Sequence, residues 1–269
     1  MAILTNSIYI VVDKDTKFTK DVEIKVVTSD QIPSKNAYLI TKNGIMLQKE
    51  SNSAIATVEV NNISALATVE KKYELKVDSI PGKVVAIAHK FFARVFKVHG
   101  SESALMLLYD NESKEYILRC PKQQVTHGSV NYKFDKFEKE EDKNRIFIGT
   151  IHSHCDFSAY HSGVDISDEE HLDGIHITIG HVNTNNPSIE SSVVFNGNRF
   201  LRNPIELITN ISLEEVKNYH NLREHKRFSF NLDENERKEV SNFNIDEWMK
   251  NVSKRNFSLF RKERNESFS

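Results

Sequence analysis

The pattern of apolar and polar residues predicts a β-rich N-terminal region over residues 1–78. Residues 22–27 alternate between apolar and polar, as expected for a strand with one buried face. Residues 38–47 are typical of a hairpin, with Asn43 and Gly44 suited to a type I′ turn. Because the region shows no catalytic constellation, we expect a small β-domain, with recognition of an extended peptide at a sheet edge as the alternative.

The spacing of apolar residues changes after a break at residues 80–82. Apolar residues recur every three or four positions over residues 83–98, which predicts a helix that ends at Gly100. Apolar runs at residues 104–109 and 145–151 predict two buried strands. This order of elements indicates that a second region with its own core begins near residue 79.

Helices and strands are also expected further along this second region. Ser167 and Glu170 fit a capping box for a short helix. Asn196 and Gly197 separate two apolar stretches and predict a closing hairpin. We therefore expect an α+β domain over residues 79–204.

Residues 205–269 have a different composition, rich in Asn, Lys, Arg and Glu. Residues 213–217 and 245–252 are typical of short amphipathic helices. Basic residues near the end are balanced by acidic ones, so a loosely ordered or partner-docking tail is favoured over a nucleic-acid surface. We expect a charged, partly helical C-terminal extension.

Composition narrows the class of protein. The 269 residues are 39% hydrophobic and 28% charged, with a net charge of -2, which is typical of a globular protein. No basic excess favours a nucleic-acid or membrane partner, and no apolar run approaches the ~20 residues that span a bilayer. Only two cysteines are present, so we expect no disulfide framework and a reducing, cytoplasmic location.

Candidate chemistry is concentrated in one motif, His-x-His followed by seven residues and Ser-x-x-Asp. His152 and His154 alternate at the end of a predicted strand, so they share a face about 7 Å apart at the backbone. Asp165 is expected in the first turn of a helix with Ser162 as its N-cap. Two imidazoles and one carboxylate form the three-ligand set of a hydrolytic zinc site, which keeps a fourth position open. The motif predicts one Zn²⁺ per chain, held by His152, His154 and Asp165.

The motif resembles the signature of the JAMM (JAB/MPN+) metalloprotease family, over roughly residues 80–204. The resemblance implies a mixed, curled β-sheet flanked by helices, in a cytidine-deaminase-like layout. It also implies a catalytic Glu on an earlier strand. Glu102 is the best candidate, because Glu112 and Glu115 fall in a predicted exposed turn. Cys155 departs from the Pro that many members carry after the second His.

The resemblance further implies a zinc metalloprotease that cuts peptide or isopeptide bonds at the C-terminus of a ubiquitin-like protein. E1- or E2-like proteins are then expected partners. Ser162 would stabilise the oxyanion or only cap the helix. The alternatives are a catalytically silent MPN-type scaffold and a zinc amidohydrolase acting on a cell-wall peptide. His171, His176 and His181 are candidates for a second metal site, and whether Cys155 or His176 contributes to the zinc site is left open.

Overall fold

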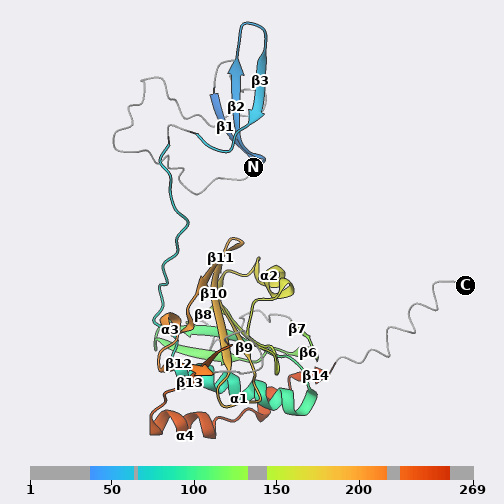
Figure 1. Cartoon of the computed structure of the whole chain (residues 1–269), viewed down its shortest axis with the longest axis vertical. Helices are drawn as coiled ribbons and strands as arrows, with labels where there is room; N and C mark the ends of the chain where they lie inside the picture. The colour runs from blue at the N-terminus through green and yellow to red at the C-terminus, as the bar shows by residue number, and fades with distance from the viewer. Residues whose placement is uncertain (1–36, 64–65, 133–143, 217–224, 255–269) are drawn as a thin grey trace, which may run out of the picture. The chain divides into compact units, whose positions relative to one another are not determined.

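The computed structural model describes residues 37–63, 66–132, 144–216 and 225–254. The chain divides into two compact units, Met1–Glu74 and Leu75–Ser269. The described residues form several sheets and a few helices, so the predicted mixed α+β class is confirmed (Figure 1). No helix in these ranges combines the length and the apolar character needed to cross a bilayer.

The first unit contains a three-stranded antiparallel sheet in the order β1-β2-β3. Its strands are β1 (Ala37–Thr41), β2 (Gly44–Glu50) and β3 (Ile55–Glu59). Thr41 pairs with Gly44, so the turn consists of Lys42 and Asn43. Neither of these two residues has a positive φ, so the predicted type I′ turn at Asn43 and Gly44 is wrong. The strand predicted over residues 22–27 lies outside the described residues.

The second unit is built on a six-stranded sheet in the order β11-β10-β9-β8-β4-β5. Strands β8 and β9 are parallel, and every other neighbouring pair is antiparallel. The strands are β4 (Ala104–Asp110), β5 (Glu115–Arg119), β8 (Arg145–Ser153), β9 (Gly174–Gly180), β10 (Ser188–Phe195) and β11 (Asn198–Arg202). The two predicted buried strands are confirmed as the neighbours β4 and β8. The predicted hairpin is confirmed as β10 and β11, joined by Asn196 and Gly197, both with positive φ.

Helix α1 (Gly82–His99) packs on this sheet and confirms the predicted helix. Its apolar residues at helical spacing are buried, among them Val85, Phe91 and Phe92. Gly100 ends the helix in the left-handed conformation, and its N–H donates to the carbonyl of Phe96. Helix α4 (Glu234–Asn242) lies against α1, as Figure 1 shows, and is joined to it by an ion pair between Lys83 and Glu239 at 2.8 Å.

Two further sequence-based predictions of local structure are wrong, both in the second unit. Helix α2 (Gly163–Glu169) begins after Ser162, so the capping box predicted at Ser167 and Glu170 is not formed. Its N-terminus lies earlier because Ser162 and Asp165 form the capping box instead. Residues 213–216 belong to strand β12 rather than to a helix, because they pair with β13 across the sheet.

Residues beyond 204 belong to the same unit as the six-stranded sheet. They form α3 (Pro204–Leu207), β12 (Ile211–Val216), β13 (His225–Phe230), α4, α5 (Asp246–Met249) and β14 (Val252–Lys254). Strand β14 pairs in parallel with β6 (Gln123–Thr126), which is also antiparallel to β7 (Ser129–Tyr132). Trp248 of α5 packs edge-on against Phe91 at 5.4 Å between ring centroids. This region therefore contains strands as well as helices, and of its two predicted helices only the one over residues 245–252 coincides with a helix, α5.

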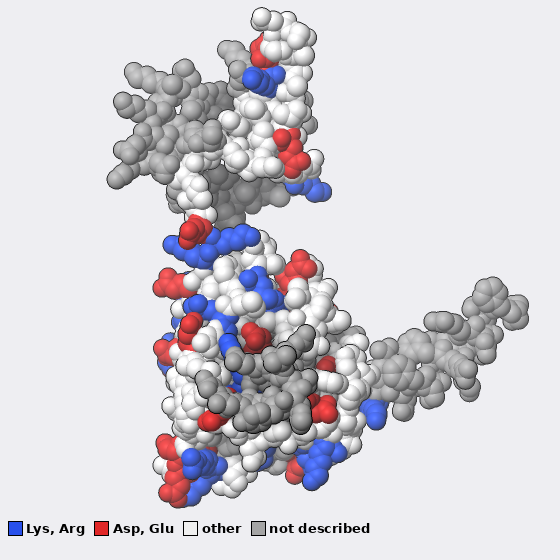
Figure 2. Space-filling model, viewed as in Figure 1, with Lys and Arg blue, Asp and Glu red and all other residues white. Residues whose placement is uncertain are grey.

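Charged side chains of both signs are interspersed on the face shown in Figure 2. Elsewhere in the described residues, charged side chains three or four positions apart form pairs, such as Lys238 with Glu234 at 2.8 Å and Lys250 with Glu247 at 2.6 Å. Exposed pairs of this kind each contribute little to stability. The distribution agrees with the nearly balanced net charge of -2.

Candidate metal centre

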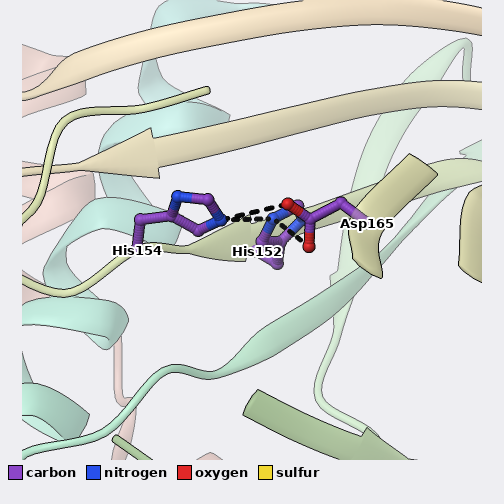
Figure 3. Close-up of side chains that lie close together, drawn as sticks. All are labelled: His152, His154 and Asp165. Atoms are coloured by element: carbon purple, nitrogen blue, oxygen red, sulfur yellow. Dashed lines mark hydrogen bonds and ion pairs between the residues drawn. The ribbon is translucent and has the colours of Figure 1, made fainter. Parts of the chain in front are cut away.

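The end of β8 and the first turn of α2 bring three potential ligands together (Figure 3). His152 Nε2 lies 3.4 Å from His154 Nε2 and 3.4 Å from Asp165 Oδ1. His154 Nε2 lies 3.2 Å from Asp165 Oδ2. Tetrahedral zinc with bonds of 2.0–2.1 Å would hold its donor atoms about 3.3 Å apart. The spacing of these donors therefore fits one zinc ion.

The two histidines are placed by the sheet and by the loop that follows it. His152 is the penultimate residue of β8, and the N–H of His154 donates to the carbonyl of Ile179 in β9 at 2.9 Å. Cys155 then turns the chain with a φ of 50°. Gly180 allows the loop to pack tightly on β9, because a Cβ there would collide with the backbone of residues 157–159. Both imidazoles are consequently buried, with 7% and 4% of their residues' surface exposed.

Asp165 is held by the capping box that starts α2. Its N–H donates to Ser162 Oγ at 3.1 Å, and its Oδ2 accepts the N–H of Ser162 at 2.7 Å. Burial acts to raise the pKa of Asp165, but hydrogen bonds with His152 and His154 outweigh it and lower the pKa strongly. The carboxylate is therefore ionised and oriented towards both imidazoles. Since Ser162 Oγ only accepts in the capping box, its hydroxyl hydrogen remains able to donate elsewhere.

Glu102 lies on the same side of the sheet as the cluster. Ser103 accepts the N–H of Ser153 at 3.0 Å and donates its own N–H to Ser153 Oγ at 3.0 Å. Extending this antiparallel pairing by one residue places Glu102 opposite His154, and residues directly opposite project to the same face. Burial raises the pKa of Glu102, while His154 and His152 act to lower it. The carboxyl group is thus within electrostatic reach of both histidines.

Sequence reasoning missed a further carboxylate, Glu169 at the end of α2. Its Oε1 lies 3.7 Å from His152 Nδ1, the ring nitrogen on the far side from the cluster. Burial lowers the pKa of His152, but Asp165, Glu169 and Glu102 together outweigh it and raise the pKa. Three carboxylates therefore surround one buried imidazole, an environment that favours a cation. The four-residue spacing of Asp165 and Glu169 is the signal that could have revealed this residue.

The other candidates are not brought to the cluster. His176 is buried and hydrogen-bonded to Thr150, while His181 interacts with Ser188 at 3.0 Å. In the part of the chain that the structure describes, His152, His154 and Asp165 are the one group of three or more potential ligands close enough to hold a metal, within 4.8 Å.

Two further residue types considered from the sequence also lie outside the cluster. Cys155 is buried, and its Sγ lies 3.6 Å from the carbonyl of His127. Glu112 and Glu115 are exposed at the turn between β4 and β5, as predicted. Of these three glutamates, Glu102 is the one within electrostatic reach of His152 and His154.

Comparison with protein-family models gives no match, and a search of curated proteins gives none either. A functional interpretation consequently depends on the geometry of the site. That geometry consists of three donors spaced for one ion, a carboxyl group on the same face, and a second carboxylate behind His152.

Proposed function

We propose that the chain is a zinc-dependent peptidase or isopeptidase of the JAMM (JAB/MPN+) type, with one Zn²⁺ held by His152, His154 and Asp165. The observation that carries this proposal is the 3.2–3.4 Å spacing of the imidazole and carboxylate donors. Two His and one Asp leave a fourth position open, as hydrolytic zinc sites do. The mixed sheet, with the cluster at the end of β8, is in keeping with the curled sheet of a JAB domain.

Each residue near the cluster has a distinct role in the proposed hydrolysis. Zinc bound there would activate a water molecule and polarise the scissile carbonyl. Glu102 would act as the general base for the attacking water and would pass the proton to the leaving amine. Ser162 donates its hydroxyl hydrogen to the developing oxyanion while its oxygen still caps α2. The capping role does not exclude the catalytic one.

The proposed substrate is the C-terminal segment of a ubiquitin-like protein or its conjugate, with E1- or E2-like proteins as further partners. Apolar side chains beside the cluster support a polypeptide substrate. Tyr160 packs edge-on against His154 with 4.8 Å between ring centroids, yet it is 55% exposed. Phe157 in the same loop is 57% exposed, so an extended peptide could pack against both rings. Cys120 and Cys155 are both free thiols, which suits the proposed cytoplasmic location.

Metal analysis of matched variants tests this function. The wild type is expected to hold about one zinc per chain, and His154→Ala should lose it. Glu102→Gln should keep the zinc but hydrolyse ubiquitin-like fusions about 10²- to 10⁴-fold more slowly. His171→Ala, which changes an exposed histidine nearby, is the control and should alter neither property.

Three outcomes would redirect the proposal. Full zinc retention by His154→Ala would contradict the ligand assignment. A wild type without zinc would favour the catalytically silent scaffold. Zinc with activity on cell-wall peptides, and none on ubiquitin-like fusions, would favour the amidohydrolase.

A further inference from the structure

We propose that Glu169, held in place by Arg199, is a positioning residue that orients His152 for metal binding. The inference rests on the proposed zinc site. It concerns residues that do not themselves belong to the three-ligand cluster.

Helix α2 has the reverse of the usual burial pattern. Glu169 is its buried residue, and its side chain is 7% exposed, whereas Val164 and Ile166 are 66% and 47% exposed. Burying an ionised carboxylate is costly unless it is paired and hydrogen-bonded. A helix of this size that buries an acid and exposes its apolar residues indicates that the acid has a specific task.

The contacts of Glu169 connect the cluster to a strand far along the chain. Its Oε1 lies 3.7 Å from His152 Nδ1 and 3.5 Å from His176 Nδ1. Its Oε2 forms an ion pair with Arg199 Nη2 of β11 at 2.8 Å. One carboxylate oxygen thus faces His152 and His176, and the other faces the guanidinium group and, at 4.0 Å, the Nδ1 of His161.

The hydrogen bonds of His176 determine which of the two histidines beside Glu169 Oε1 can donate to this oxygen. His176 Nε2 lies 2.8 Å from the carbonyl of Leu172, which can only accept, so the ring hydrogen is on Nε2. His176 Nδ1 then accepts from the hydroxyl of Thr150 at 2.8 Å. The neutral ring therefore has no hydrogen to offer Glu169.

His152 has the opposite arrangement. Its Nε2 faces the donor cluster, so a metal bound there requires the ring hydrogen on Nδ1, facing Glu169. The 3.7 Å separation is longer than a hydrogen bond, so the attraction in this structure is that of an ion pair. Carboxylates behind metal-binding histidines commonly fix the tautomer and the ring orientation. Glu169 has the position for this role.

Arg199 holds the carboxylate of Glu169 in place through the 2.8 Å ion pair with its Oε2. The guanidinium also donates from Nη1 to Ser192 Oγ, which fixes it to the neighbouring strand β10. Removing Arg199 would therefore weaken the effect of Glu169 on His152 without touching the cluster.

Zinc affinity, measured by competition with a chromogenic chelator on the full chain, tests the inference. Glu169→Gln should weaken zinc binding about 10- to 100-fold while the stoichiometry at saturating zinc stays at about one. Glu169→Asp, which retains the charge, should bind more tightly than Glu169→Gln. Glu170→Gln is the matched control, because it makes the same change at the neighbouring exposed residue, and it should bind as the wild type does.

Coupling between the two residues provides a second readout. Arg199→Gln should weaken zinc binding in the same direction, and adding it to Glu169→Gln should cause little further loss, because Arg199 acts through Glu169. Circular dichroism of the zinc-free proteins checks that each variant is folded.

The possible failures are distinguishable. If the wild type binds zinc and folded Glu169→Gln binds it equally well, the positioning role is overturned and the proposed function stands. Fully additive losses in the double variant would overturn the role of Arg199. A wild type that binds no zinc overturns both proposals.

Discussion

Helices α1 and α2 of the same unit are held by opposite kinds of contact. Helix α1 has 18 residues and buries an apolar face that includes Phe91 and Phe92. Helix α2 has seven residues and is fixed by a capping box and by the buried Glu169. The first is stabilised by removing apolar surface from water, and the second by a few directional polar contacts.

This difference in contacts explains which of the two helices can orient functional side chains. Apolar burial is non-directional, so it fixes a helix in the fold without orienting any one functional atom. Hydrogen bonds and ion pairs orient individual atoms, as the N–H of Ser162 does for Asp165 Oδ2 at 2.7 Å. Helix α2 therefore supplies groups to the site, and α1 supplies the core beneath the sheet.

The largest expected effect comes from the core of α1. Phe91→Ala should lower the free energy of unfolding by about 3–5 kcal/mol, because it removes a fully buried aromatic ring. Urea denaturation of the zinc-free protein measures this change. Val98→Ala, at a half-exposed position of the same helix, should change it by less than about 0.5 kcal/mol. A similar loss in both variants would show that α1 is not held by its apolar face.

A smaller effect is expected from the pH dependence of stability through His89 in α1. Burial lowers the pKa of His89 to about 4, from an ordinary value of 6.5. Between these two values the unfolded chain binds a proton that the folded chain does not, so stability falls as the pH falls. The free energy of unfolding should fall by about 1.4 kcal/mol per pH unit in this range, and by at most about 3 kcal/mol in total.

Urea denaturation of the zinc-free wild type and of His89→Gln at pH 7.5, 6.5, 5.5 and 4.5 isolates this contribution. Other buried histidines, such as His161 and His176, have lowered pKa values for the same reason and contribute equally to both proteins. If the free energy of unfolding changed equally with pH in the two proteins, this would count against a neutral, largely enclosed His89.

The smallest expected effect concerns the start of α2. Ser162→Ala removes the acceptor for the N–H of Asp165 and should destabilise the helix by about 1 kcal/mol. Faster hydrogen exchange of the α2 amides measures this local change. Ser167→Ala alters an exposed serine inside the same helix and is the control. Greater exchange in the Ser167 variant would instead support the capping box first expected there.

The periodicity of apolar residues correctly predicted the elements that bury a single continuous face. Helix α1, strands β4 and β8, and the turn at Asn196 and Gly197 were all found where the pattern placed them. Local patterns failed where pairing with a distant strand decided the structure. Residues 213–216 have a helical pattern, yet they pair with β13. Ser167 resembles an N-cap, but the capping contacts already formed at Ser162 place it inside the helix.

The sequence by itself determined the motif of His152, His154 and Asp165, because its spacing lies within a strand, a loop and one helical turn. Only the tertiary structure decided that Glu102 comes within electrostatic reach of His154 and that Arg199 reaches Glu169. Those contacts join segments 30 or more residues apart, and they depend on the register of β4 against β8 and on how β11 is placed in the same sheet. Hydrogen bonding between strands fixes that register, and no local pattern of residues contains it.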